Sequence, residues 1–214
     1  MGRAKVRYEW RAWASAFPDL PNPATGQESS ETYFLLPGHD GCNLKLREGR
    51  LELKRLAGVS HGLQRWRFNP AKEFPLAVDD LPPPVRACMA SVKFLPGEHE
   101  LRDALRRAGL AVVDIRKLRR LFSVDGCQDE VTLVEQAGAT ATTAAIEAET
   151  LDAARQAVAS LELDRWPNRA YPAALAAWIA GRLTEVAPPP PVSQLGPATA
   201  SGRAVTGGGT SLEG

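Results

Sequence analysis

The sequence predicts an α+β fold, built mainly from antiparallel β-strands with helices beside them. Apolar and charged residues alternate with a period of two along most of the chain, as in strands with one polar face. Apolar residues at helical spacing are confined to three segments. With 214 residues, of which 44% are hydrophobic, the chain is long enough for one domain with its own core.

The alternation is clearest near the N-terminus, where apolar Val6, Tyr8, Trp10 and Ala12 are interleaved with charged Lys5, Arg7, Glu9 and Arg11. Residues 33–36 form a further expected strand. Residues 43–47 and 51–54 repeat the alternating pattern, and the Glu48-Gly49-Arg50 link between them predicts a hairpin. Residues 63–68 follow with the same period.

Strands are also expected over residues 112–122, 127–134 and 144–149, which brings the expected number to about eight. Helices are expected over residues 98–108, which end at Gly109, over residues 151–161, and over residues 171–183, with Pro172 in the first turn. The proline-containing stretches 17–27 and 81–84 predict loops.

The composition changes near the C-terminus. Residues 185–214 contain four consecutive prolines and a Gly207-Gly208-Gly209 run, and they are too poor in apolar residues to offset the entropy of ordering. This segment is expected to be a disordered tail. Residues 1–184 are expected to form the folded domain.

The overall charge argues against two classes of partner. Lys and Arg number 26 against 25 Asp and Glu, for a net charge of +1, so no field of the whole molecule favours nucleic acid or an anionic membrane. No apolar run is long enough for a signal peptide or a membrane span, which predicts a cytoplasmic protein. Cys42, Cys88 and Cys127 lack C-x-x-C spacing and are expected to be buried free thiols.

Charged residues two apart on a strand share a face, and several of them carry the same charge. Neighbouring like charges repel unless a counter-charge relieves them. Phosphate oxygens would neutralise Lys and Arg, while carboxylates would hold Mg²⁺ or Mn²⁺. The pairs that favour a polyphosphate site are Lys45 with Arg47, Arg65 with Arg67, Lys117 with Arg119, and Glu147 with Glu149.

The order of these motifs over residues 5–183 resembles the CYTH (triphosphate tunnel) family. The resemblance implies a closed eight-stranded antiparallel β-barrel of the triphosphate tunnel type, with flanking helices and a polar interior. The motifs that carry it are Tyr8-Glu9-Trp10-Arg11, Glu31-Thr32-Tyr33, Asn43-Leu44-Lys45-Leu46-Arg47, Leu53-Lys54, Lys117-Leu118-Arg119, Asp129-Glu130-Val131, Ile146-Glu147-Ala148-Glu149 and Asn168-Arg169-Ala170-Tyr171-Pro172.

The resemblance also implies a metal-dependent hydrolase of inorganic or organic triphosphates, with Mg²⁺ or Mn²⁺ as cofactor. It assigns catalysis to Glu9 and Lys117. It assigns metal binding to Glu130, Glu147 and Glu149. Phosphate binding falls to Arg11, Lys45, Arg47, Lys54, Lys117 and Arg119, with Arg65 and Arg67 extending the basic wall.

One departure from the family pattern keeps other functions open. The first strand of the family carries E-x-E-x-K, whereas this strand keeps Glu9 but has Arg11 and Trp13 in place of the second Glu and the Lys. The alternatives are a catalytically degenerate barrel that binds a phosphorylated ligand, an interaction module with a charged sheet, or an ordinary sheet with one solvated face. A homodimer also stays open, because Trp10, Trp13 and Trp66 could cover a dimer surface as well as a core.

Overall fold

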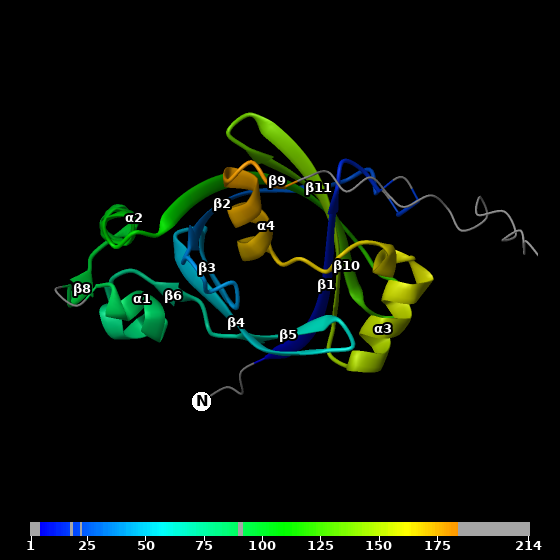
Figure 1. Cartoon of the computed structure of the whole chain (residues 1–214), viewed down its shortest axis with the longest axis horizontal. Coiled ribbons are helices and arrows are strands. Elements are labelled where there is room, and N and C mark those ends of the chain that lie inside the picture. The colour runs from blue at the N-terminus through cyan, green and yellow to red at the C-terminus, as the bar shows by residue number, and fades with distance from the viewer. Residues whose placement is uncertain (1–4, 18, 22, 90–91, 184–214) are drawn as a thin grey trace, which may run out of the picture.

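The computed structural model describes residues 5–183 except for residues 18, 22, 90 and 91. Its centre is a closed antiparallel barrel of eight strands (Figure 1). The strands follow the order β3-β2-β9-β10-β11-β1-β5-β4, and pairing of β3 with β4 closes the ring. The α+β barrel expected from the sequence is thus confirmed. The strands are β1 (Val6–Ala14), β2 (Gln27–Leu35), β3 (Cys42–Arg47), β4 (Arg50–Ser60), β5 (Leu63–Phe68), β9 (Ala111–Phe122), β10 (Gln128–Gln136) and β11 (Ala139–Ala148).

Three two-residue links join neighbouring strands as tight hairpins. Each places two consecutive residues at positive φ, which gives a turn whose twist matches that of the flanking strands. Glu48 and Gly49 adopt φ values of 51° and 70° between β3 and β4, so the predicted hairpin is confirmed. His61-Gly62 and Ala137-Gly138 make the corresponding turns after β4 and β10.

Strand register decides which side chains enter the barrel. On β1, Arg7 lies opposite Trp66 of β5, and Glu9 lies opposite Glu147 of β11. Because successive side chains on a strand point to opposite faces, these charged residues share the inner face with Trp13, whereas Tyr8, Trp10 and Ala12 share the outer one. The barrel therefore encloses its charged face.

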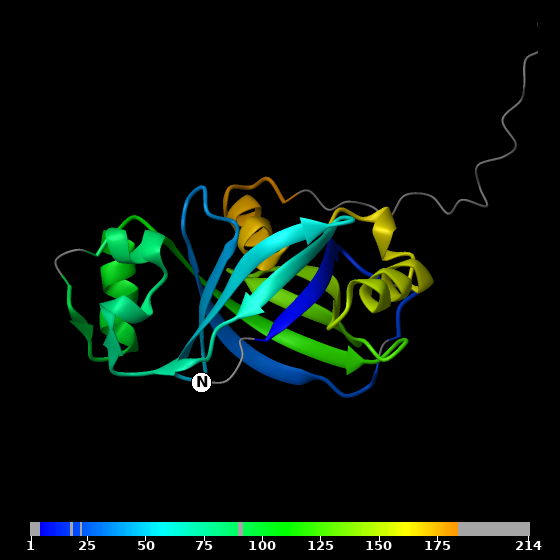
Figure 2. The same cartoon turned by 90° about the horizontal axis from the view of Figure 1, so that it is seen from below.

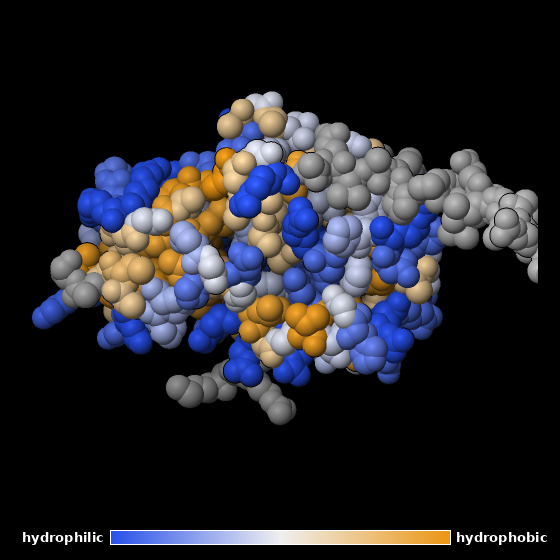
Figure 3. All heavy atoms as spheres, viewed as in Figure 1, coloured by the Kyte–Doolittle hydropathy of each residue, from blue (hydrophilic) through white to orange (hydrophobic). Residues whose placement is uncertain are grey.

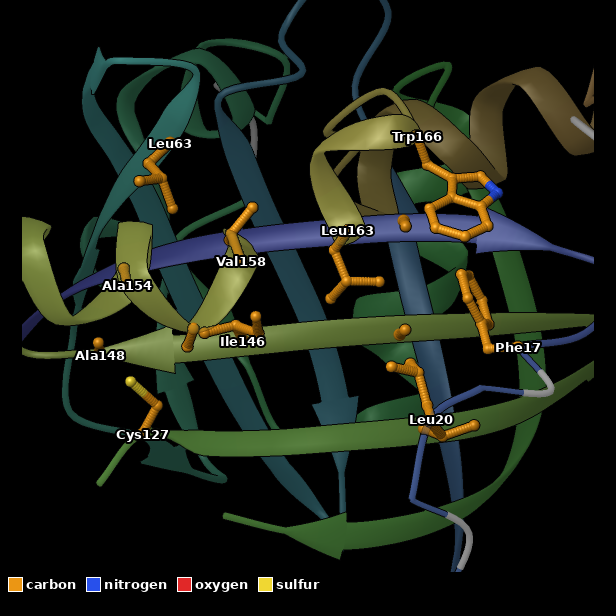
Figure 4. Close-up of a cluster of buried hydrophobic side chains, with 14 of the residues drawn as sticks. Phe17, Leu20, Leu63, Cys127, Ile146, Ala148, Ala154, Val158, Leu163 and Trp166 are labelled. Atoms are coloured by element: carbon orange, nitrogen blue, oxygen red, sulfur yellow. The ribbon is translucent and has the colours of Figure 1, made fainter. Parts of the chain in front are cut away.

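A hydrophobic cluster covers the outside of β1 and β11 (Figure 4). It is formed with α3 (Leu151–Ser160) and the short 3-10 helix η2 (Leu163–Arg165). The Thr150 side chain caps α3 by accepting a hydrogen bond from the Ala153 backbone N–H. Ile146 and Val158 lie at the centre of the cluster, and Phe17 packs on Trp166 at 5.3 Å between ring centroids.

The helix α4 (Tyr171–Ile179) lies across the ring of strands and fills one end of the barrel (Figure 1). Its Tyr171 stacks on Tyr33 at 5.3 Å and meets Trp13 edge-on at 5.0 Å between ring centroids. The Trp13 indole N–H donates to the Arg169 carbonyl, which fixes the segment that leads into α4. The complete inner cluster comprises Trp13, Tyr33, Leu35, Val113, Ile115, Val134, Tyr171, Ala174 and Leu175.

A small second layer projects from the opposite side to α3 (Figure 2). It contains β6 (Lys72–Glu73), β7 (Leu76–Ala77), the 3-10 helix η1 (Val78–Asp80), α1 (Pro83–Ala87), β8 (Phe94–Leu95) and α2 (Glu98–Arg107). Leu101 and Leu105 of α2 are fully buried in the hydrophobic cluster that this layer forms with β2, β3 and β4. Figure 3 shows hydrophobic side chains gathered on this side of the molecule, with hydrophilic side chains over most of the remaining face.

Some sequence predictions need correction. The loop expected over residues 81–84 gives way to α1, because proline in the first turn of a helix costs no hydrogen bond. Cys42 is half-buried and Cys88 exposed, so only Cys127 is the buried free thiol expected of all three. Trp13 and Trp66 are core residues. The predicted tail lies outside the described residues, and within residues 5–183 no helix is both long and apolar enough to span a membrane.

Candidate functional site

The half of the barrel interior that α4 leaves open is a cavity of about 400 Å³. This volume lies within the roughly 300–1,000 Å³ typical of small-ligand sites. Eight Lys and Arg residues line it against five Asp and Glu, and Glu31 adds a further carboxylate beneath. Cationic charge is therefore in excess. The lining cations are Lys5, Arg7, Arg11, Lys45, Arg47, Lys54, Lys117 and Arg119.

Glu31 is the buried anion around which the lysines gather. Its side chain is fully buried on β2, 2.6 Å from Lys117 Nζ and 3.0 Å from Lys45 Nζ. Arg119 Nη2 lies 3.3 Å away, and the Tyr33 hydroxyl donates a hydrogen bond to Oε2. Burial alone would raise the pKa of Glu31, but the charges of Lys117 and Lys45 outweigh it and hold the pKa well below its usual range.

The lysines and arginines around Glu31 outnumber the carboxylates that they contact. Burial and the charge of Lys45 hold the pKa of Lys117 well below its usual value, against the opposing attraction of Glu31. Burial likewise lowers the pKa of Lys45 despite Glu31 and Glu52. Glu31 and Glu52 together face two lysines and two arginines, Lys45, Lys117, Arg47 and Arg119, so an additional anion in the cavity would be stabilised here.

Arg11 binds two carboxylates from different strands. Its Nε lies 2.9 Å from Glu9 Oε1, and its Nη1 lies 2.9 Å from Glu130 Oε1 on β10. The guanidinium carbon is 4.5 Å from the centre of the Tyr171 ring, a cation–π contact. Burial opposes ionisation of Glu9, but Lys54 and Arg11 hold its pKa at about 2. The charges of Arg11 and Arg119 similarly lower the pKa of Glu130 against its burial.

Lys54 and Arg7 contact the carboxylate of Glu147. Lys54 Nζ is 3.0 Å from Glu147 Oε1 and 3.5 Å from Glu9 Oε2. Arg7 Nη1 lies 3.9 Å from Glu147 Oε2, a looser contact. Within the described residues, Arg7 Nε and the Tyr171 hydroxyl are buried polar atoms without a hydrogen-bond partner. Both residues line the cavity, so both offer an unused donor to a ligand.

The structure brings together most of the site residues expected from the sequence. Glu9, Lys117 and all of the expected phosphate-binding residues on β1, β3, β4 and β9 line the cavity, as do Glu130 and Glu147. Arg65 and Arg67 do not: they pair opposite Tyr8 and Val6, which places them on the outer face, and both are exposed. Glu149 follows the end of β11, and its side chain is 75% exposed.

The sequence did not assign every residue of the site to it: Arg7, Glu31, Tyr33 and Tyr171 are among those missed, although the last three stand in the motifs that carry the family resemblance. The signal for Arg7 was its place two residues before Glu9 on the same strand face. Glu31 stands at the start of the buried run that ends at Leu35, where a lone carboxylate needs a partner. The place of Tyr171 in the cavity gives no local signal, because the insertion of α4 is a tertiary contact.

The carboxylates do not fit the expected metal site. All six carboxylate oxygens of Glu9, Glu130 and Glu147 face a Lys or Arg nitrogen within 3.9 Å. Mg²⁺ and Mn²⁺ require carboxylate oxygens that are free to coordinate. Among the described residues, no group of three or more His, Cys, Asp or Glu side chains is placed to hold a metal ion.

Comparison with known proteins gave matches to solved structures alone. No family model matches the chain, and no curated protein matches it. A candidate adenylate cyclase from Bacillus halodurans is 14% identical, with a TM-score of 0.47 over 80% of this chain and 97% of that one. HpAC1 of Hippeastrum, described as having a dominant triphosphatase activity, is 14% identical, with a TM-score of 0.44 over 83% and 97%. The inorganic triphosphatase NE1496 is 12% identical, with a TM-score of 0.33 over 73% and 80%.

The strand order, the closure of the ring and the charged interior define the class of fold. The chain is a closed barrel of the triphosphate tunnel type with a few flanking helices. The expected likeness to a divergent CYTH-like protein is therefore confirmed for the fold.

Proposed function

We propose that the barrel binds a linear oligophosphate, such as inorganic triphosphate or the triphosphate group of a small molecule, inside its cavity. The observation that carries the proposal is the excess of cations in an enclosed space, where two lysines have lowered pKa values. An oligophosphate supplies several negative charges within a narrow chain, so it can meet cations on several strands at once.

Arg7 is the best residue for a test. Its guanidinium lies at 3.9 Å from both Glu147 and Glu149, and its buried Nε has no partner among the described residues. Apart from a 3.2 Å hydrogen bond from Nη1 to Gln128 Oε1, Arg7 can therefore turn to a ligand without breaking a short contact. Hydrogen bonds to charged groups contribute about 1.5–3 kcal/mol, so Arg7→Gln should weaken binding by about tenfold or more.

The experiment is isothermal titration calorimetry with tripolyphosphate and orthophosphate. Arg65→Gln is the matched control, since Arg65 lies on the next strand but on the outer face. We expect tripolyphosphate to bind more tightly than orthophosphate, Arg7→Gln to lose affinity, and Arg65→Gln to keep it. Absence of tripolyphosphate binding, or an equal loss in both variants, would overturn the proposal.

Hydrolysis is a separate question that the same samples answer. Glu9 and Lys117 remain the predicted catalytic residues, but both are held in short ion pairs. Release of orthophosphate from tripolyphosphate in the presence of Mg²⁺ or Mn²⁺, lost in Glu9→Gln, would extend the proposal from binding to hydrolysis. Binding without release would support the non-catalytic form.

A further inference from the structure

A cation of the chain itself, Arg11, already lies between the carboxylates of Glu9 and Glu130. The Arg11 side chain is only 4% exposed and connects Glu9 with Glu130 through two 2.9 Å contacts. A third contact, from Nη1 to Thr143 Oγ1 at 3.4 Å, holds the guanidinium to β11. Arg11 is thus fixed by three strands at the place where the two carboxylates approach one another.

The second oxygen of each of these carboxylates also contacts a cation. Glu9 Oε2 faces Lys54 Nζ at 3.5 Å, and Glu130 Oε2 faces Arg119 Nε at 3.5 Å. A divalent ion could bind between Glu9 and Glu130 only by displacing a buried guanidinium and leaving it close to the incoming positive charge. Such displacement is unfavourable, because an uncompensated buried charge is costly and like charges repel.

We infer that Arg11 takes the place of a divalent cation, and that the cavity binds an oligophosphate in its metal-free form. The inference rests on the proposed function for its ligand and on the Arg11 contacts for the exclusion of metal. A metal-free oligophosphate carries more negative charge than its Mg²⁺ complex. This fuller charge suits the cationic excess of the lining.

The first test concerns the ligand-free protein and does not depend on anion binding. Free Mn²⁺ gives a strong electron paramagnetic resonance signal that falls when the ion binds a protein. We expect the wild-type protein to leave this signal unchanged and Arg11→Glu to reduce it. Arg106→Glu, on the exposed side of α2, is the control that adds the same charge change outside the cavity. Loss of the signal with wild-type protein would overturn the inference, and this measurement stands even if Arg11→Glu does not fold.

The second test compares tripolyphosphate binding to the wild-type protein by calorimetry in EDTA and in excess Mg²⁺. Because Mg²⁺ sequesters tripolyphosphate in solution, binding of the metal-free anion should be as tight in EDTA or tighter. Affinity that rises tenfold or more on adding Mg²⁺ would overturn the inference. No binding in either buffer would overturn the proposed function instead, and the Mn²⁺ signal would still decide whether Arg11 excludes the ion.

Discussion

Replacing Glu31 with Gln tests whether one buried carboxylate organises the cationic interior. The substitution keeps the shape of the side chain and removes its charge. Lys45 and Lys117 would then be left within the barrel without the anion that they now contact at 3.0 and 2.6 Å. Arg119, at 3.3 Å, would lose the same partner.

The expected loss of stability follows from the burial of these groups. Removing one partner of a buried ion pair costs about 3–5 kcal/mol, because the other charge remains uncompensated. We take the lower end, about 3 kcal/mol, since a lysine can lose its proton and the Gln amide can still accept hydrogen bonds. For a domain of this size, this corresponds to a fall of roughly 6–12 °C in Tm.

Urea and thermal unfolding of the wild-type protein, Glu31→Gln and Glu48→Gln provide the measurement. Glu48 makes a 3.3 Å ion pair with Arg50, but both side chains are exposed, so its substitution should cost less than about 1 kcal/mol. Tripolyphosphate at about 100 times its Kd for the wild-type protein should add about 2.7 kcal/mol to the free energy of unfolding of the wild type. At the same concentration we expect the free energy of unfolding of Glu31→Gln to rise by more, because the ligand supplies the missing negative charge.

Two outcomes would refute this reasoning. If Glu31→Gln were no less stable than Glu48→Gln, the lysines would not depend on the buried carboxylate. If the variant were destabilised as expected but gained no more from tripolyphosphate than the wild type, the ligand would not sit near the lysine cluster.

Two further predictions concern proton binding. Burial raises the pKa of Asp129 from 3.8 to about 6, so the folded protein holds a proton there that the unfolded chain has lost. The stability that this proton contributes is present below about pH 4 and is lost as the pH rises through about 6. Asp129→Asn should therefore be more stable than the wild type by on the order of 2 kcal/mol near pH 7.5, and urea unfolding at several pH values should show a smaller difference near pH 5. A variant that is less stable than the wild type near pH 7.5 would contradict this. Because burial and Lys45 lower the pKa of Lys117 and a bound anion would raise it, binding of tripolyphosphate should take up protons and weaken as the pH rises. Calorimetry in two buffers of different ionisation enthalpy measures this uptake, which Lys117→Met should reduce; equal enthalpies in the two buffers would count against it.

The barrel strands could be predicted from the sequence because each carries its own alternation. On β1, charged residues at every second position specify one polar face whatever the neighbouring strands are. The turn at Glu48-Gly49 could be predicted as well, since the link is short and contains glycine. Closure of the barrel then turns these polar faces inward, and this step was implied by the family resemblance.

The remainder of the site depends on register and tertiary packing. Arg65 and Arg67 show the same spacing as Lys45 and Arg47, yet pairing opposite Tyr8 and Val6 puts them outside. Alternation within a strand shows that two residues share a face, but it does not show which face is inside. The pairing of Arg11 with Glu130 joins residues 119 positions apart and gives no local signal.

The position of α4 in one end of the barrel limits how a ligand can enter and leave the cavity. With Tyr171, Ala174 and Leu175 packed into one end of the barrel, side chains close that end of the interior. A long phosphate polymer could not be threaded through the closed end and could only insert a chain terminus. A ligand in the cavity must therefore enter and leave by a route other than the end that α4 fills.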